Sequence, residues 1–155
     1  MAEREALFGT DLRLLPDLGL RHSDRDGGHD LTTIHRPPRD GRDLDTVTGS
    51  DNLIQALVLR LLTPVGELAP LGHPDYGSRL SELVGERNTE TTRNRAKLFV
   101  LQALQAEPRV ERVLSARVVQ ADRSQIDIHV TLLAIEGVTP LNLVVPFSLA
   151  GGPGP

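Results

Sequence analysis

The spacing of apolar residues changes at Pro108, and this change constrains the fold more than any other feature of the chain. Before Pro108 the apolar residues recur at every third or fourth position, as they do on one face of a helix. After it they alternate with polar residues, as in strands that bury one face. The order predicts an α+β domain, with helices first and an antiparallel sheet after them.

A first helix is predicted over residues 51–62. Its apolar residues form one stripe at helical spacing, namely Leu53, Ile54, Leu57, Val58 and Leu61. Ser50 or Asp51 is placed to cap its first amides, and Thr63 before Pro64 should end it. Prolines and glycines then crowd residues 63–78, so we expect a loop of defined shape and a helical turn near 78–84.

A second, longer helix is predicted to begin after Asn88 or Thr89, either of which can cap it. Pro108 should end it near Ala106 or Glu107, because proline cannot continue a helix. Its stripe consists of Ala96, Phe99, Val100, Ala103 and Leu104, and Leu98 and Leu101 widen it. This pattern is typical of a central core helix.

Three strands are predicted after Pro108. The first covers residues 110–119, the second alternates from Ile126 to Leu132, and the third alternates from Leu141 to Phe147. Short turns join them at residues 122–124 and 137–140. The expected fold class is therefore α+β, with two main helices packed on a three-stranded antiparallel β-meander. His129 falls on the polar side of the second strand, which faces solvent.

The composition changes abruptly near Ser50 and again at the glycine- and proline-rich end of the sequence, which predicts three regions. Residues 1–47 are polar and rich in turn residues, and we expect a loosely structured N-terminal extension of short strands and loops that orders when neighbouring subunits bind it. Residues 48–149 form the domain. Residues 150–155 are a glycine- and proline-rich tail that is predicted to be disordered.

Charge and composition exclude several classes of function. The net charge is -4, and three Phe and one Tyr are too few aromatic side chains for stacking bases, so no nucleic-acid partner is expected. Cys is absent and the histidines are not paired at ligand spacing, so we expect no metal and no cofactor. No apolar stretch is long enough to span a bilayer and no leader is visible, which favours a cytoplasmic protein without a membrane partner.

Several short segments, in order, resemble one known family. These are residues 49–57, residues 60–68, residues 73–80 and the tripeptide Glu107-Pro108-Arg109 that follows the second helix. They resemble the lysozyme-like baseplate wedge proteins of contractile phage tails. That family also includes sheath initiators of extracellular contractile injection systems and a baseplate component of type VI secretion. The resemblance runs from about residue 43 to residue 147.

The resemblance implies a structural role and two contact regions. Family members grip the core bundle of the larger wedge subunits and start the contractile sheath, with six copies in each baseplate; tube or spike-hub proteins are further candidate partners. Glu107, Pro108 and Arg109 are the implied wedge contact. The implied sheath contact is the last strand, at Leu141, Asn142, Leu143, Val144 and Val145, which would pair with a strand of the sheath protein. Pro146 departs from an ideal edge because it lacks one donor.

Other interpretations of these residues stay open. Glu107 and Arg109 can equally be a solvated acid and base at a helix end. Glu67 and Asp75 are the one carboxylate pair we would nominate for a peptidoglycan-hydrolysing, lysozyme-like activity, although we expect no enzyme. A third alternative is an unrelated adaptor that binds a peptide strand. In the loop before residue 78, Tyr76 is predicted to pack on the core, and Gly77 is predicted to be required by its backbone conformation.

Overall fold

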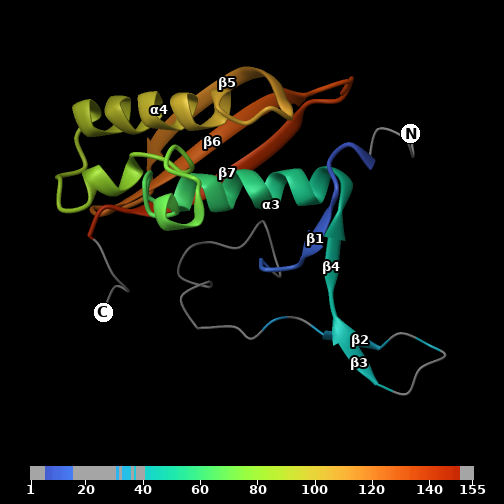
Figure 1. The fold of residues 1–155 in the computed structure, drawn as a ribbon. Helices are drawn as coiled ribbons and strands as arrows, with labels where there is room; N and C mark the ends of the chain where they lie inside the picture. Colours follow the sequence, from blue (N-terminus) through green and yellow to red (C-terminus); the bar gives the residue numbers. More distant parts are fainter. Residues whose placement is uncertain (1–5, 16–30, 32, 36, 38–40, 151–155) are drawn as a thin grey trace.

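The computed structural model describes residues 6–15, 31, 33–35, 37 and 41–150. It has two layers: a three-stranded sheet, and two helices that cover one of its faces (Figure 1). The helices are α3 (Gly49–Leu62) and α4 (Glu90–Gln105), and the strands are β5 (Val110–Gln120), β6 (Gln125–Ala134) and β7 (Leu141–Ser148). All three strands are antiparallel in the order β5-β6-β7, which confirms the predicted α+β meander.

The two helix starts differ in how they are capped. In α4 the predicted cap is confirmed, because the Thr89 hydroxyl accepts a hydrogen bond from the Thr92 amide at 3.2 Å. In α3 the prediction of a cap at Ser50 or Asp51 is wrong. The helix begins at Gly49, its cap residue Thr48 makes no side-chain bond, and the Gly49 amide donates to the Gly9 carbonyl instead. Strand β4 (Thr46–Thr48) runs directly into the helix, so α3 begins before the residues that the sequence pattern predicted as its cap.

The core lies between the helices and one face of the sheet. It is built from the predicted stripes of α3 and α4 together with one face of β6, whose buried members are Ile126, Ile128, Val130, Leu132 and Ala134. The opposite face of β6 carries Asp127, His129 and Thr131, and His129 is exposed as predicted. Leu98 was expected to join the core but is 52% exposed, because the other apolar residues of α4 already fill the side that meets the sheet.

The N-terminal segment that the structure describes is held by α3. Gln55 is 1% exposed, and its amide oxygen accepts from the amides of Leu14 and Leu15 at 2.9 and 3.1 Å. Its amide nitrogen donates to the Leu12 carbonyl at 2.9 Å. Asn52, also buried, donates to the Phe8 carbonyl at 2.8 Å. These bonds explain why two polar residues occupy the buried side of an apolar helix.

The described part of the extension also contains short strands. Strand β1 (Thr10–Leu12) pairs with β4, and β2 (Thr33–His35) pairs with β3 (Arg42–Leu44), both antiparallel. Residues 16–30 of the predicted extension, and all of the predicted tail over 150–155 except residue 150, lie outside the described residues. Within those that are described, no helix is long and apolar enough to cross a membrane.

Residues 63–85 form the corner that connects α3 to α4, and they lie at one end of the two helices (Figure 1). The Ser78 amide donates to the Thr63 carbonyl at 2.8 Å, and the chain contains two short 3-10 helices, η1 (Ala69–Leu71) and η2 (Leu80–Leu83). Gly77 has φ +113°, and a Cβ there would lie 2.4 Å from the Thr63 carbonyl oxygen. The prediction that this position requires glycine is therefore confirmed.

The end of β7 is fixed at two points. The Leu149 amide donates to the Ser124 carbonyl at 2.7 Å, and the Leu149 carbonyl accepts from the Gly85 amide at 2.7 Å. The side chain of Leu149 is 1% exposed and belongs to the core. The last strand is thereby tied both to the β5–β6 turn and to the corner that follows η2.

Candidate interaction sites

Glu107 lies just past the end of α4 and forms a buried ion-pair cluster. Its carboxylate accepts from Arg109 Nε at 2.7 Å and from Arg60 Nη2 at 3.3 Å. The Glu107 side chain is 6% exposed, so it is not the solvated acid that a helix end by itself would suggest. Arg60 comes from the last turn of α3, and Arg109 comes from the residue before β5. The cluster therefore joins both helices to the start of the sheet.

Arg60 is the buried partner in this cluster. Its guanidinium lies over the ring of Tyr76 at 4.5 Å, so the half-buried Tyr76 contacts Arg60, and it is not among the residues of the apolar core that the sequence predicted it to join. Arg60 Nε is buried and has no hydrogen-bond partner among the described residues. Burial raises the pKa of the Tyr76 hydroxyl, although the positive charge of Arg60 opposes this. The ring and the carboxylate thus hold the guanidinium from two sides.

The electrostatics favour an ionised Glu107. Burial by itself would raise the pKa of its carboxyl group, but the hydrogen bond and charge of Arg109, with help from Arg60, hold the pKa below its ordinary value. Two cations face one anion, so the cluster carries an excess of positive charge. An acidic group of a partner would be the complementary ligand.

Arg109 is the accessible cation of the cluster. Its side chain is 27% exposed, and Pro108 beside it is also exposed. Arg109 Nη1 donates to the Phe8 carbonyl at 3.3 Å, and its own carbonyl accepts from the Ile135 amide at 3.0 Å. Of the predicted wedge contact, Pro108 and Arg109 can therefore reach a partner directly, whereas the carboxylate of Glu107 orients Arg109 from inside.

The predicted sheath contact lies on an edge strand. Strand β7 pairs with β6 and has no strand on its other side among the described residues. Leu143 and Val145 bury their side chains in the core, Leu141 is half-buried, and Asn142 and Val144 are exposed. Of the five predicted residues, only Asn142 and Val144 are thus exposed.

The direction of the backbone groups follows from the register of β7. The Leu149 amide donates across to Ser124, and the pairing then continues without a shift from Gln125 and Ser148 to Leu132 and Leu141. In an antiparallel pair, alternate residues point their N–H and C=O groups to the same neighbour. The N–H and C=O groups of Asn142 and Val144 therefore point away from β6, to the free edge.

Like Asn142 and Val144, Pro146 has its backbone groups on the side of β7 that faces away from β6. It lies opposite Asp127 in the register, and its missing N–H would point to the free edge. The β6–β7 pair therefore loses no hydrogen bond to the proline. A strand that pairs with the outer side of β7 would find donors at Asn142 and Val144 and none at Pro146.

The acid–base cluster and the free edge lie at the same end of the sheet. Arg109 is bonded through its carbonyl to Ile135, which directly follows β6. Leu141, the first residue of β7, pairs with Leu132 near that end of β6. Strands β5 and β7 are the two outer strands of the sheet. The cluster lies beside the start of β5, and the outward backbone groups of Asn142 belong to β7.

The alternative catalytic pair consists of two exposed residues. Glu67 and Asp75 both lie in the corner before η2, and both are open to solvent. A carboxyl group that serves as the general acid of a glycosidase is usually sheltered so that it keeps its proton. The described part of the chain also holds no group of three acidic, His or Cys side chains that could bind a metal ion.

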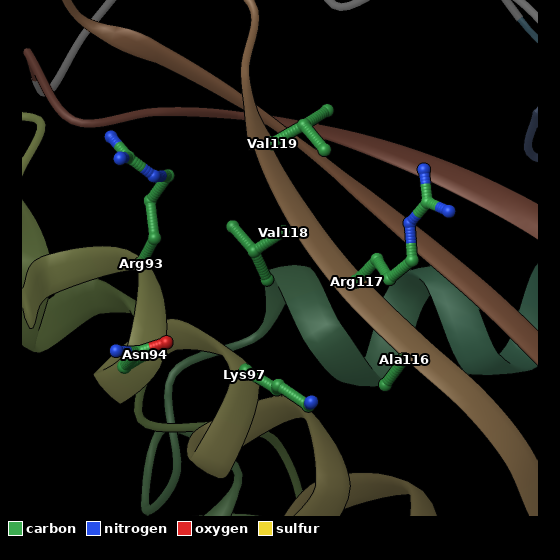
Figure 2. Close-up of a pocket in the computed structure, with 7 residues that line it drawn as sticks. All are labelled: Arg93, Asn94, Lys97, Ala116, Arg117, Val118 and Val119. Atoms are coloured by element: carbon green, nitrogen blue, oxygen red, sulfur yellow. The ribbon is translucent and has the colours of Figure 1, made fainter. Parts of the chain in front are cut away.

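A further concave site was not anticipated from the sequence. A cleft of about 230 Å³ lies between the first half of α4 and the second half of β5. Figure 2 shows its lining residues, which are Arg93, Asn94, Lys97, Ala116, Arg117, Val118 and Val119. Arg93 and Lys97 are one helical turn apart, a signal that is visible in the sequence, but only the topology reveals that β5 is an outer strand beside them.

Comparison with solved structures finds a similar fold. A protein from Geobacter sulfurreducens, named "putative tail lysozyme", superposes with a TM-score of 0.56 at 25% sequence identity. The match covers 64% of this chain and 89% of the Geobacter chain. No protein-family model matches the sequence, and no curated protein matches it. The fold of this chain is therefore similar to that of a tail-related protein.

Proposed function

We propose that this chain is a structural, non-catalytic component of the baseplate of a contractile, phage-tail-like machine. Its free β7 edge would pair with a strand of the contractile sheath protein, and its Pro108–Arg109 turn would contact the larger wedge subunits. Two observations support a tail role: the sequence resemblance and the fold similar to that of the Geobacter protein. Six copies around a baseplate, assembled in the cytoplasm, are the corresponding expectation.

One observation carries the proposal, namely the free backbone groups of Asn142 and Val144. Unpaired N–H and C=O groups at a sheet edge are a template for a strand from another chain. Natural proteins usually cover or charge such an edge, yet Asn142 and Val144 carry no charge and Val144 is 41% exposed. Pro146 limits the template to the first half of β7 and would set where the incoming strand stops.

The wedge contact is supported by the cluster around Glu107. A buried carboxylate holds Arg109 in one orientation, with the exposed Pro108 beside it. A guanidinium held in this way loses little conformational freedom when it binds an acidic side chain. Arg109 would therefore present a prepared cation to the neighbouring subunit.

The experiment uses one substitution for each contact. Val144→Pro removes an outward donor as Pro146 already does, so the β6–β7 pair should remain; Val144→Thr is the matched control. Arg109→Lys keeps the charge but loses the planar fork. Each variant is co-expressed with the sheath and wedge proteins encoded beside the chain, and complexes are isolated by affinity capture and imaged by electron microscopy.

The two variants should fail differently. Val144→Pro should abolish sheath capture and retain the wedge subunits, whereas Arg109→Lys should weaken wedge capture by roughly tenfold or more. Circular dichroism verifies that both variants are folded. Normal sheath assembly on Val144→Pro baseplates would rule out pairing at the β7 edge, and an absence of sheath and tube genes near this gene would count against the tail role as a whole.

The name of the Geobacter protein favours a second candidate, hydrolysis of peptidoglycan. Glu67 and Asp75 would then be the acid and its partner. Release of soluble fragments from purified peptidoglycan, lost in Glu67→Gln, would establish this activity. We favour the structural role because both carboxylates are exposed to solvent.

A further inference from the structure

The cleft between α4 and β5 lies along the outer edge of the sheet, opposite to β7. Arg93, Asn94 and Lys97 line it from the helix, and residues 116–119 line it from the strand (Figure 2). Figure 2 also shows Val118 turned to the helix side of β5, whereas Arg117 and Val119 extend on the other side. One wall of the cleft is thus a helix surface, and the other is an outer strand in which Arg117 is exposed, Val118 and Val119 are half-buried and Ala116 is 8% exposed.

Backbone groups of β5 point into this cleft. The Ala121 amide donates to the Gln125 carbonyl at 3.0 Å, and the pairing continues without a shift from Gln120 to Ser115. By the alternation of an antiparallel pair, the N–H and C=O groups of Ala116 and Val118 point away from β6. No other strand pairs with β5 in the described part of the chain. These two residues therefore offer donors and acceptors to an added strand.

Three of the seven residues that line the cleft are cationic, namely Arg93, Lys97 and Arg117. Lys97 and Arg117 are exposed, and neither is bonded to another described side chain. Arg93 donates to the Asn88 side chain at 2.8 Å and keeps its charge. The lining contains no acidic residue; the acids Glu90 and Asp122 flank these segments in sequence without lining the cleft. The charge of the cleft is complementary to a carboxylate-bearing partner.

The spacing of the cations matches an extended chain. Arg93 and Lys97 are four residues apart on a helix, a rise of about 6 Å. Alternate residues of a strand are separated by about 6.6 Å and point to the same side. Two acidic residues at alternate positions of an added strand would therefore face Arg93 and Lys97 in turn, and an acid on its opposite side would face Arg117.

We propose that the cleft binds an extended acidic segment of a partner protein, which adds to the edge of β5 by pairing with Ala116 and Val118. A volume of 230 Å³ is below the range of about 300–1,000 Å³ usual for small-molecule sites and suits a few side chains of a peptide. A chain with a net charge of -4 and few aromatic residues is poorly suited to nucleic acid. This site lies on the opposite outer strand from β7 and does not depend on the proposed sheath contact.

The test uses a labelled heptapeptide of alternating Thr and Glu and its counterpart in which Lys replaces Glu. Fluorescence polarisation measures the Kd of both for the full chain. We expect binding of the acidic peptide alone, weakened about five- to tenfold by Lys97→Glu and by Arg117→Glu. Arg112→Glu is the matched control, since Arg112 is an exposed cation of β5 outside the cleft and its reversal should change the Kd little.

Hydrogen exchange then tests the backbone pairing. The bound acidic peptide should slow exchange of the Ala116 and Val118 amides by roughly tenfold or more, without a comparable change at Asn142 and Val144. The proposal fails if the acidic peptide binds no better than the lysine peptide, or if Arg112→Glu weakens it as much as Lys97→Glu does. It also fails if inorganic polyphosphate or single-stranded DNA binds the cleft while the peptide leaves both amides unprotected.

Discussion

Arg60 and Glu107 are 47 positions apart in the sequence, and a hydrogen bond of 3.3 Å joins their side chains inside the protein. Both side chains are nearly excluded from solvent, at 11% and 6% exposure. The bond connects the last turn of α3 to the residue that follows α4. The relative position of the two helices therefore depends on a charged contact as well as on apolar packing.

Replacement of Glu107 by Gln should destabilise the protein by about 1–3 kcal/mol, because it leaves the buried Arg60 without a compensating charge. Urea unfolding at pH 7 measures the loss. Glu82→Gln is the matched control, since Glu82 also pairs with an arginine, Arg79, but that pair is largely exposed. The control should have no measurable effect, and equal losses in the two variants would show that burial of the Glu107 pair is unimportant.

The same pair should make stability depend on pH. The folded pKa of Glu107 lies below the ordinary value of 4.5, so its ionised form stabilises the native state. That contribution is complete above 4.5 and is lost as the pH falls through 4.5 to the folded pKa. The free energy of unfolding of the wild type should therefore approach that of Glu107→Gln at low pH. A constant difference between the two proteins across this range would contradict the prediction.

Gly77→Ala should destabilise the protein by about 2 kcal/mol or more, because the new Cβ would meet the Thr63 carbonyl oxygen in an already unfavourable backbone conformation. Gly72→Ala separates the effect of the steric clash from the effect of the backbone conformation. Gly72 also has positive φ, at +87°, but has nothing within 4 Å of the added Cβ. Gly72→Ala should therefore lower the free energy of unfolding by only roughly 1 kcal/mol. Thermal unfolding of the two variants is the comparison, and a Gly77→Ala protein as stable as Gly72→Ala would show that the corner relaxes.

Gln55→Met keeps the volume of the buried side chain but removes its three hydrogen bonds to the N-terminal segment. The amides of Leu14 and Leu15 should then exchange with solvent roughly tenfold faster or more, since they lose their acceptor. Gln102→Met on the exposed side of α4 is the control. Unchanged protection of both leucines would mean that the segment is held by packing of Phe8 and Leu15 rather than by Gln55.

The helices and the meander could be predicted because their apolar periods are local and interrupted by clear breakers. Thr89 as a cap, the end of α4 and the need for glycine at position 77 follow from such short-range signals. The start of α3 could not be predicted, because β4 leads directly into the helix and the acceptor of the Gly49 amide is the Gly9 carbonyl, 40 residues earlier in the sequence. The exposure of Leu98 also escaped prediction, since the number of packed sides of α4 is a tertiary property.

The candidate sites were only partly predictable for the same reason. The resemblance drew attention to Glu107 and Arg109, but their partner Arg60 belongs to another helix and reaches them only through the fold. The outward direction of the Asn142 and Val144 backbone depends on the register with β6. The cleft beside β5 is lined by residues of two elements, so no single segment of the sequence predicts it.

The two anchors of Leu149 have a mechanical consequence. If a strand of a contractile sheath pairs with β7 as proposed, contraction would pull on β7, and a strand held by one neighbour alone could separate from it one hydrogen bond at a time. The bonds from Leu149 to Ser124 and Gly85 would carry such a load into the β5–β6 turn and the segment that follows η2. At this end, β7 could then not separate from the domain without breaking both bonds.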